Sequence, residues 1–290
     1  MEDWLQKEKK CKFRKVSRYN LLAFLYMLSI IWYYFNNIKI RRVCLIIYNN
    51  FAYVYDKLTL DIDYKKWADY VESILKKNNL NASMILELGC GTGSFGVEMA
   101  RRGYDMICLD LSSDMLDCAA EKAEKEGLDI LFLNQNMCSF ELYGTVDAIV
   151  CLLDSFNYLT NPSQINKMFK LVKNYLNPGG LFIFDINTQY KFENTIADNL
   201  FYEINDEVTY IWENAYNPKT RKARFDLTFF VMKDGLYERF DETHYEKAYS
   251  DSEIMDFIKN SGMEFVSRFG ELTLRKPSPI SQRNFYVCRK

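Results

Sequence analysis

The run Ile85-Leu86-Glu87-Leu88-Gly89-Cys90-Gly91-Thr92-Gly93 decides the fold of this chain. It joins a short apolar strand, expected over 84–88, to a helix expected over 94–102. Glycine at such a turn lets the backbone bend tightly and come close to a ligand. By itself the turn could equally serve a dinucleotide or no ligand at all. Its spacing is G-x-G-x-G rather than G-x-G-x-x-G, and Glu87, two residues before Gly89, favours a cationic ligand over a pyrophosphate.

A second acid follows at the end of the next expected strand. Asp110 closes the strand expected over 106–110, 17 residues beyond Gly93. A carboxylate at that point can accept two hydrogen bonds from ribose hydroxyls. Alternatively, Asp110 is an ordinary acid at a helix start, where Ser112 or Ser113 is the N-cap. The glycine turn upstream favours the ribose interpretation.

Strands and helices alternate around these two acids. Apolar periodicity predicts a helix over 67–77, strands over 84–88, 106–110, 130–133, 146–152 and 181–186, and helices over 94–102, 113–126 and 163–176. Asn177-Pro178-Gly179-Gly180 is predicted to be a turn before the fifth strand. This alternation implies a parallel sheet that helices cover on both faces.

Beyond Asn187 the alternation stops. Residues 199–247 are typical of antiparallel strands, with turn signals at Asn217-Pro218 and Asp234-Gly235. A helix over 251–260 and strands over 264–269 and 284–288 then return to the first sheet. We therefore expect an α/β, Rossmann-like fold with a seven-stranded mixed sheet and helices on both faces. Residues 48–188 and 248–290 form this core, and residues 189–247 form a small antiparallel β lid.

The first 47 residues differ from the rest and are predicted to form a basic and apolar N-terminal helical extension. Residues 1–48 hold ten Lys/Arg and three Asp/Glu. The apolar run over 21–35 is too short to cross a hydrocarbon core of ~30 Å at ~1.5 Å per residue. Three interpretations stay open: a weak membrane-surface contact through residues 7–48, a helix packed on the domain, which we prefer, or a leader from an upstream start codon.

Composition narrows the class of protein. Residues 49–290 hold 27 Lys/Arg against 36 Asp/Glu, so we expect poor binding of nucleic acid, which requires clustered basic residues. The eight cysteines form no C-x-x-C pair, which is typical of reduced thiols in a cytoplasmic protein. A single histidine without a Cys/His cluster predicts no metal site.

Several segments, taken in order, make residues 48–290 resemble the class I S-adenosylmethionine-dependent methyltransferases. Within this class they resemble the bacterial small-molecule-type group that carries a β-sheet lid. The matching segments are Phe51-Ala52-Tyr53-Val54-Tyr55-Asp56, the glycine-rich run, Leu109-Asp110-Leu111-Ser112-Ser113-Asp114-Met115-Leu116, Asn134-Gln135-Asn136-Met137, Leu152-Leu153-Asp154-Ser155-Phe156-Asn157-Tyr158-Leu159, and LNPGGLFIFDIN over 176–187.

The resemblance implies S-adenosylmethionine as the cofactor. Glu87 and the backbone at Gly89 would meet the methionyl amine, and Asp110 would hold the ribose. Leu111 and Met115 would pack on the adenine. The full set of predicted cofactor-binding residues is Tyr55, Trp67, Glu87, Gly89, Gly91, Gly93, Asp110, Leu111, Met115, Asn136, Met137, Leu152 and Asp154.

One residue of this set differs from many relatives, and two others have an alternative structural role. Position 136 is Asp in many relatives, whereas here it is Asn136, whose carbonyl can still accept a hydrogen bond from the adenine amino group. Tyr55 and Trp67 would close over the methionine tail, or they simply pack the first helix of the domain.

Methyl transfer is an in-line displacement, for which an enzyme aligns the acceptor, excludes water and removes a proton. The candidate catalytic residues are Asn157 and Tyr158, after the fourth strand, and His244 in the lid. A neutral His244 could accept a proton near pH 7, or it is a half-buried lid residue without a catalytic role. Four lid aromatics could wall an acceptor pocket or form a plain lid core: Tyr210, Trp212, Tyr216 and Phe229.

We therefore expect an enzyme that transfers a methyl group to N or O of a small-molecule acceptor. Three alternatives remain at this point. The acceptor could be tRNA or protein, with the basic extension as its handle. The chain could be a non-catalytic adenosyl-ligand-binding partner protein. It could also be a fold relative that uses a modified cofactor, such as an aminopropyl transferase. The sequence leaves the oligomeric state open.

Overall fold

The computed structural model describes residues 50–59 and 61–290. The chain divides after Tyr48 into two units, and every structural statement below concerns the unit Asn49–Lys290. The predicted N-terminal extension over 1–47 lies outside the described residues. Within residues 50–59 and 61–290, no helix is long and apolar enough to cross a membrane.

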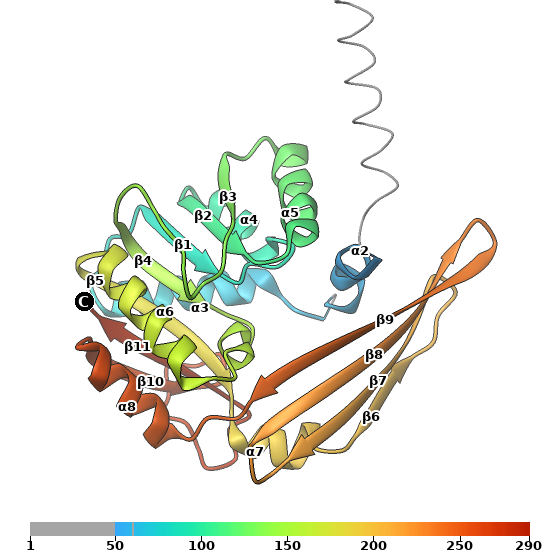
Figure 1. Ribbon diagram of the computed structural model, residues 1–290. Coiled ribbons are helices and arrows are strands. Elements are labelled where there is room, and N and C mark those ends of the chain that lie inside the picture. Colours follow the sequence, from blue (N-terminus) through green and yellow to red (C-terminus); the bar gives the residue numbers. More distant parts are fainter. Residues whose placement is uncertain (1–49, 60) are drawn as a thin grey trace, which may run out of the picture. The chain divides into compact units, whose positions relative to one another are not determined.

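The larger sheet has seven strands in the order β10-β11-β5-β4-β1-β2-β3 (Figure 1). β1 to β5 run parallel, whereas β11 lies antiparallel between β5 and β10. The predicted seven-stranded mixed sheet is confirmed. The strands are β1 (Met84–Leu88), β2 (Asp105–Asp110), β3 (Ile130–Asn134), β4 (Val146–Cys151), β5 (Leu176–Asn187), β10 (Glu264–Gly270) and β11 (Arg283–Arg289).

The chain order around β1 determines where a ligand can bind. From β1 the chain proceeds outward to β2 and β3, and it then returns to the other side of β1 as β4. Crossovers on the two sides of β1 leave in opposite directions, so a crevice opens at the carboxyl ends of β1 and β4. The glycine-rich turn follows directly after β1, at this crevice.

Helices cover both faces of the sheet, as predicted. On one face, α3 (Tyr64–Lys77), α4 (Ser94–Arg101) and α5 (Ser113–Glu126) pack on a layer that includes Ile85 and Val150. On the other face, α6 (Pro162–Tyr175) and α8 (Asp251–Ser261) pack on Leu86 and Ile149. Successive residues of a strand point to opposite faces, so a strand buried on both sides is apolar throughout.

Local signals account for the ends of these helices. The Ser112 side chain accepts a hydrogen bond from the amide of Met115 at the start of α5, and Gly127 ends that helix in the left-handed region. Ser250 and Glu253 form a capping box at the start of α8. The helix boundaries therefore lie close to those that the sequence predicts.

One predicted turn belongs to a strand instead. β5 begins at Leu176, and Asn177-Pro178-Gly179-Gly180 lies within it. Leu176 pairs with Val146 and Leu181 pairs with Ala148, so the residues between them bulge out of a ladder that continues on both sides. Gly179 does adopt the positive φ, 81°, that such a turn uses. The four residues nevertheless form a bulge within β5 and do not mark the start of the strand.

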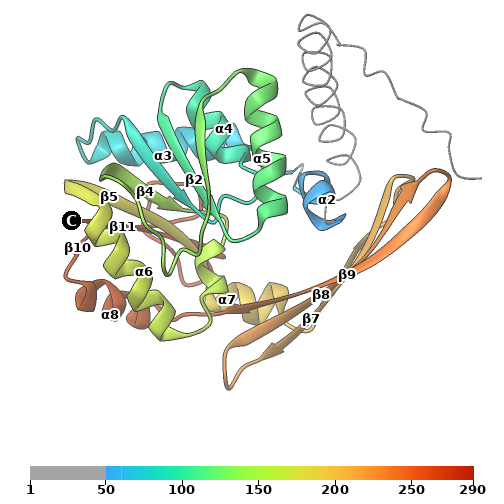
Figure 2. The ribbon, with the colours of Figure 1, turned by 45° about the horizontal axis from the view of Figure 1, so that its top comes forward.

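The lid is a separate antiparallel sheet in the order β6-β7-β8-β9 (Figures 1 and 2). Its strands are β6 (Leu200–Glu203), β7 (Val208–Asn217), β8 (Lys222–Lys233) and β9 (Leu236–Lys247). Lys233 pairs with Leu236 across Asp234 and Gly235, which both have positive φ, as a two-residue hairpin turn requires. The sheet joins the core through two short helical segments, α7 (Gln189–Lys191) and η2 (Phe192–Ile196), and one bridge from Thr188 to Tyr249.

Candidate active site

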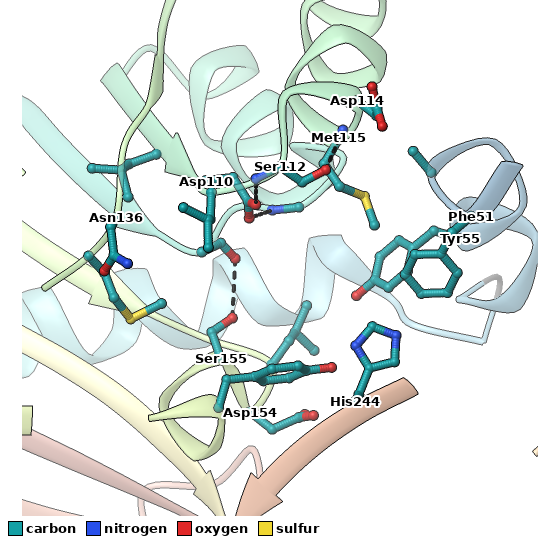
Figure 3. Close-up of a pocket in the computed structure, with 18 of the residues that line it drawn as sticks. Phe51, Tyr55, Asp110, Ser112, Asp114, Met115, Asn136, Asp154, Ser155 and His244 are labelled. Carbon is teal, nitrogen blue, oxygen red and sulfur yellow. Dashed lines mark hydrogen bonds between the residues drawn. The ribbon is translucent and has the colours of Figure 1, made fainter. Parts of the chain in front are cut away.

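The glycine-rich turn is held in the left-handed backbone region. Gly89, Gly91 and Gly93 have φ values of 71°, 54° and 73°. The Gly89 amide donates to the carbonyl of Leu109 at 2.8 Å, which ties the turn to β2. The hydroxyl of Ser155 donates to the Gly89 carbonyl at 3.1 Å (Figure 3). A Cβ at Gly89 would lie 2.9 Å from both Cβ and Oγ of Ser155, so this position has no room for a side chain.

Asp110 faces the turn from the end of β2. Its carboxylate accepts from the amides of Gly91 at 2.8 Å and Ser112 at 2.9 Å. Burial raises the pKa of Asp110, and these two amides oppose that shift. Each carboxylate oxygen keeps a second lone pair for a ligand. Because Ser112 caps α5, Asp110 is not needed as a cap.

A chamber of about 570 Å³ adjoins the turn, and we call it the turn-side chamber. Its volume lies within the ~300–1,000 Å³ typical of small-molecule sites. Eleven predicted site residues line it: Tyr55, Gly89, Gly91, Asp110, Leu111, Met115, Asn136, Met137, Asp154, Tyr158 and His244. These residues come from six separate stretches of the chain, several of which Figure 3 shows around the chamber.

Asn136 lines this chamber, but its side-chain oxygen already accepts one hydrogen bond. Its side-chain carbonyl accepts from the backbone amide of Cys138 at 2.8 Å. The hydrogen bond expected from an adenine amino group would therefore use the second lone pair of the same oxygen.

Glu87 is not placed at the chamber. Strand alternation turns its side chain to the Ile85 face of the sheet, beneath α4, where it is 4% exposed. Burial raises its pKa to about 8, although the Cys108 thiol and the Gly96 amide donate hydrogen bonds to it. A Cβ at Gly96 would lie 3.0 Å from a Glu87 carboxylate oxygen, so the missing side chain of that glycine makes room for the acid. Glu87 lines neither chamber described here, and its contact with a methionyl amine stays a prediction.

Three other predicted cofactor-binding residues lie outside the turn-side chamber. Gly93 is the N-cap of α4, and a Cβ there would lie 2.6 Å from the Ala119 Cβ of α5. Leu152 is a buried core residue. Trp67 lines a second chamber, described below, where the Arg283 guanidinium lies 5.3 Å from the centroid of its ring.

Asn157, predicted to be catalytic, is completely buried and lines neither chamber. Its side-chain amide donates to the carbonyl of Lys247 at 2.9 Å, and its side-chain oxygen accepts from the amide of Asn187 at 2.9 Å. These contacts join η1 (Ser155–Tyr158) to the two chain segments that enter and leave the lid. Asn157 therefore ties η1 to the base of the lid, and its catalytic role stays a prediction.

The second chamber, also about 570 Å³, lies on the lid side, and we call it the lid-side chamber. Tyr210 and Trp212 line it, whereas Phe229 is fully buried in the lid core and Tyr216 stacks on Phe192. The two chambers share six lining residues, which we call the junction: Phe51, Tyr55, Leu153, Asp154, Tyr158 and His244.

His244 projects from β9 into the junction, where Figure 3 shows it beside Phe51 and Tyr55. Its ring centroid lies 5.2 Å from that of Phe51 and 5.9 Å from that of Tyr158. Burial lowers its pKa, so the imidazole is neutral at pH 7. Within the described part of the chain, its Nε2 has no hydrogen-bond partner.

Sequence reasoning missed a charged cluster, most of whose members line the lid-side chamber. Arg283 forms ion pairs with Asp154, at 2.9 Å, and with the fully buried Asp185. Lys191 and Glu246 complete the cluster. These residues come from four distant segments, and no local motif marks them.

Comparisons with known proteins agree with this geometry. Residues 85–180 match a family model described as a methyltransferase domain. A "Putative methyltransferase" of Geobacillus sp. (strain WCH70) is 34% identical over 84% of this chain and 99% of its own length. "Putative methyltransferase YqeM" of Bacillus subtilis (strain 168) is 32% identical over 84% of this chain and 97% of its own length.

A solved structure extends the match to three dimensions. The crystal structure of an S-adenosylmethionine-dependent methyltransferase from Clostridium acetobutylicum superposes with a TM-score of 0.77 at 34% identity, over 83% of this chain and 98% of that one. The glycine turn, the carboxylate at the end of β2, and these full-length matches place the chain among the class I S-adenosylmethionine-dependent methyltransferases.

Proposed function

We propose that this enzyme transfers the methyl group to N or O of a small molecule that binds in the lid-side chamber. The observation that carries the proposal is the pair of adjoining chambers, which meet at a junction with an unpartnered imidazole nitrogen among the described residues. One chamber has the features of a nucleoside site, and the other has aromatic walls. A lid-side chamber of about 570 Å³ suits a small acceptor.

The turn-side chamber fits S-adenosylmethionine. The glycine turn leaves backbone exposed to a ligand, because among the described residues a Cβ at Gly91 would meet only Tyr55, at 3.9 Å. Asp110 offers free lone pairs for ribose hydroxyls. Leu111 is 71% exposed and lies with Met115 on the chamber wall, where a flat base would cover both side chains.

When bound, S-adenosylmethionine supplies an electrophilic methyl group, whose bond to sulfur breaks, with the electron pair going to sulfur, as a lone pair of the acceptor forms the new bond. The residues of the chain align the acceptor and exclude water. Phe51, Tyr55 and Tyr158 would confine the acceptor atom at the junction. His244, neutral at pH 7, would take the proton that the acceptor atom releases.

Calorimetry with S-adenosylhomocysteine tests the cofactor site. Asp110→Ala should weaken binding at least ~10-fold, a loss of ~1.4 kcal/mol, because the ribose hydroxyls lose their acceptor. Asp105→Ala, at the exposed other end of β2, is the matched control and should bind like wild type. Equal affinity of the two variants would contradict the assigned role of Asp110.

The acceptor class is tested by following S-adenosylhomocysteine formation by the full chain. Pools of small amines and hydroxyl compounds are compared with tRNA and with protein extracts. The proposal expects turnover with small molecules, and turnover with tRNA or protein alone would contradict it. A cytoplasmic location belongs to the same proposal and is supported by the six free thiols of the described residues.

A further inference from the structure

Glu246, a member of the charged cluster, lies two residues along β9 from His244 of the junction. Glu242, His244 and Glu246 occupy alternate positions of β9, so their side chains lie on one face of the lid sheet. Glu242 lines the turn-side chamber, His244 lines both chambers, and Glu246 lines the lid-side chamber. Two residues of a strand span about 7 Å. Glu246 therefore lies about 7 Å along β9 from His244, which lines both chambers.

Glu246 is held in place but keeps one oxygen available. It is 2% exposed, and the Asn187 side chain donates a hydrogen bond to it. Its Oε2 has no partner among the described residues. A buried carboxylate oxygen without a donor costs several kcal/mol, so a fold that carries one commonly uses it for a ligand. Glu246 is among the residues that line the lid-side chamber, so a ligand in that chamber lies next to its carboxyl group.

The neighbouring charges favour a cation at this point. Asp154, Asp185 and Glu246 stand against Lys191 and Arg283, which leaves one excess negative charge when all are ionised. Arg283 is engaged by the two aspartates, and Lys191 donates to the Asn187 side-chain oxygen at 2.9 Å. Neither cation is hydrogen-bonded to Glu246 in the described structure. An ammonium ion beside Glu246 would neutralise the cluster.

Without a bound cation, the cluster opposes the ionisation of two of its members. Burial, followed by the charge of Asp154, raises the pKa of Glu246 well above its ordinary value, and burial lowers the pKa of Lys191. Both shifts mean that the site disfavours charge while it holds no cation. A bound ammonium would stabilise the ionised form of Glu246 and gain a charge-assisted hydrogen bond.

The aromatic walls of the lid-side chamber limit the size and polarity of the part of the acceptor that carries no ammonium group. Trp212 lies between Phe201 and Phe225, with ring centroids 5.5 Å and 5.6 Å away. Such walls cover the apolar surface of a compact ring or short chain. A long or strongly anionic molecule matches neither the volume nor the charge of this chamber.

We propose that Glu246 is a specificity-determining residue that binds an ammonium group of the acceptor, about 7 Å from the atom that is methylated. The acceptor class is thus a compact, amine-bearing molecule with a second nucleophilic group. This inference rests on the proposed function, because it takes the junction as the place of methyl transfer.

The test uses the full chain saturated with S-adenosylhomocysteine and four cyclohexane probes, of which three match in size and the fourth is a larger dianion. They are trans-1,4-diaminocyclohexane, trans-4-aminocyclohexanol, cyclohexane-1,4-diol and cyclohexane-1,4-dicarboxylate, with binding measured by ligand-observed NMR. We expect the two amines to bind at least about tenfold tighter than the diol, and the dicarboxylate to bind most weakly. Glu246→Gln should abolish the preference for amines and leave diol binding unchanged. Glu238→Gln, on the exposed end of the same strand, is the matched control and should keep the preference.

Each other outcome has a defined meaning. Equal binding of diamine and diol, a preference that survives in Glu246→Gln, or binding of no probe by wild type would overturn the inference. Failure of S-adenosylhomocysteine itself to bind would instead overturn the proposed function. Thermal unfolding of the protein without ligand adds a second measurement. A residue kept for ligand binding should leave the Tm unchanged or raised in Glu246→Gln, whereas a fall of several degrees would indicate a structural role.

Discussion

Replacing Gly89 by alanine tests the argument that the glycine turn forms the cofactor site. The new Cβ would lie 2.9 Å from Cβ and Oγ of Ser155 and 3.3 Å from the terminal methyl of Met137. Ser155 also donates to the Gly89 carbonyl, and both neighbours line the turn-side chamber. The clash must therefore move the wall of the site. We expect S-adenosylhomocysteine to bind at least ~10-fold more weakly, equal to ~1.4 kcal/mol.

Gly127→Ala separates this effect from the cost of the backbone conformation. Gly127 has φ 66° against 71° for Gly89, but a Cβ there meets nothing within 4 Å. Both variants should lose roughly 1–2 kcal/mol of unfolding free energy for a left-handed alanine. Overpacking should add about 1–3 kcal/mol at Gly89 alone. Urea unfolding and calorimetry measure the two quantities. If Gly89→Ala binds S-adenosylhomocysteine as tightly as Gly127→Ala does, the reasoning about the turn is refuted.

Three further predictions follow from other parts of the structure. His244→Asn should lower kcat by about 10²-fold with little change in cofactor affinity, since a positioned base contributes roughly that much. Burial lowers the pKa of His244, so wild-type activity should fall as the pH drops through a value below 6.5, and a pH–rate profile with the same acid limb in the variant would rule out this role. Asn157→Ala should cost about 1–3 kcal/mol of stability, because it leaves buried backbone groups at the base of the lid without partners, while S-adenosylhomocysteine affinity stays near wild type. Burial opposes ionisation of Glu253, but hydrogen bonds from Arg221 and from the helix cap lower its pKa to about 2. Its contribution to stability is therefore complete above its ordinary pKa of 4.5 and is lost as the pH falls towards 2, so Glu253→Gln should flatten the acid limb of a Tm-against-pH curve.

Much of the core architecture is encoded locally. The strand into the glycine turn and the helix bounded by Ser112 and Gly127 lie where the sequence predicts them. Apolar periodicity, caps and turn residues act over a few neighbouring positions, so a single chain carries this information in readable form. The same holds for Asp110, because its distance from the turn follows from the length of one βαβ unit.

The surroundings of a single side chain, by contrast, depend on elements that are distant in the sequence. Glu87 has the right residue type next to the turn, yet the pleat of β1 turns it beneath α4, where Gly96 leaves the space. Asn157 likewise appears in a predicted site segment, but the base of the lid folds over it and uses its amide. In both cases the neighbours that decide the outcome come from another element of the fold.

The sequence alone therefore determined the sheet, the glycine turn and the carboxylate that faces it, because each depends on short-range periodicity and spacing. The tertiary structure alone decided the charged cluster of the lid-side chamber. Arg283 meets Asp154 only because β11 inserts antiparallel beside β5, and Glu246 meets the same cluster only because β9 returns from the lid to the core. Contacts between residues of such distant segments leave no local pattern, since they arise from packing of the whole domain.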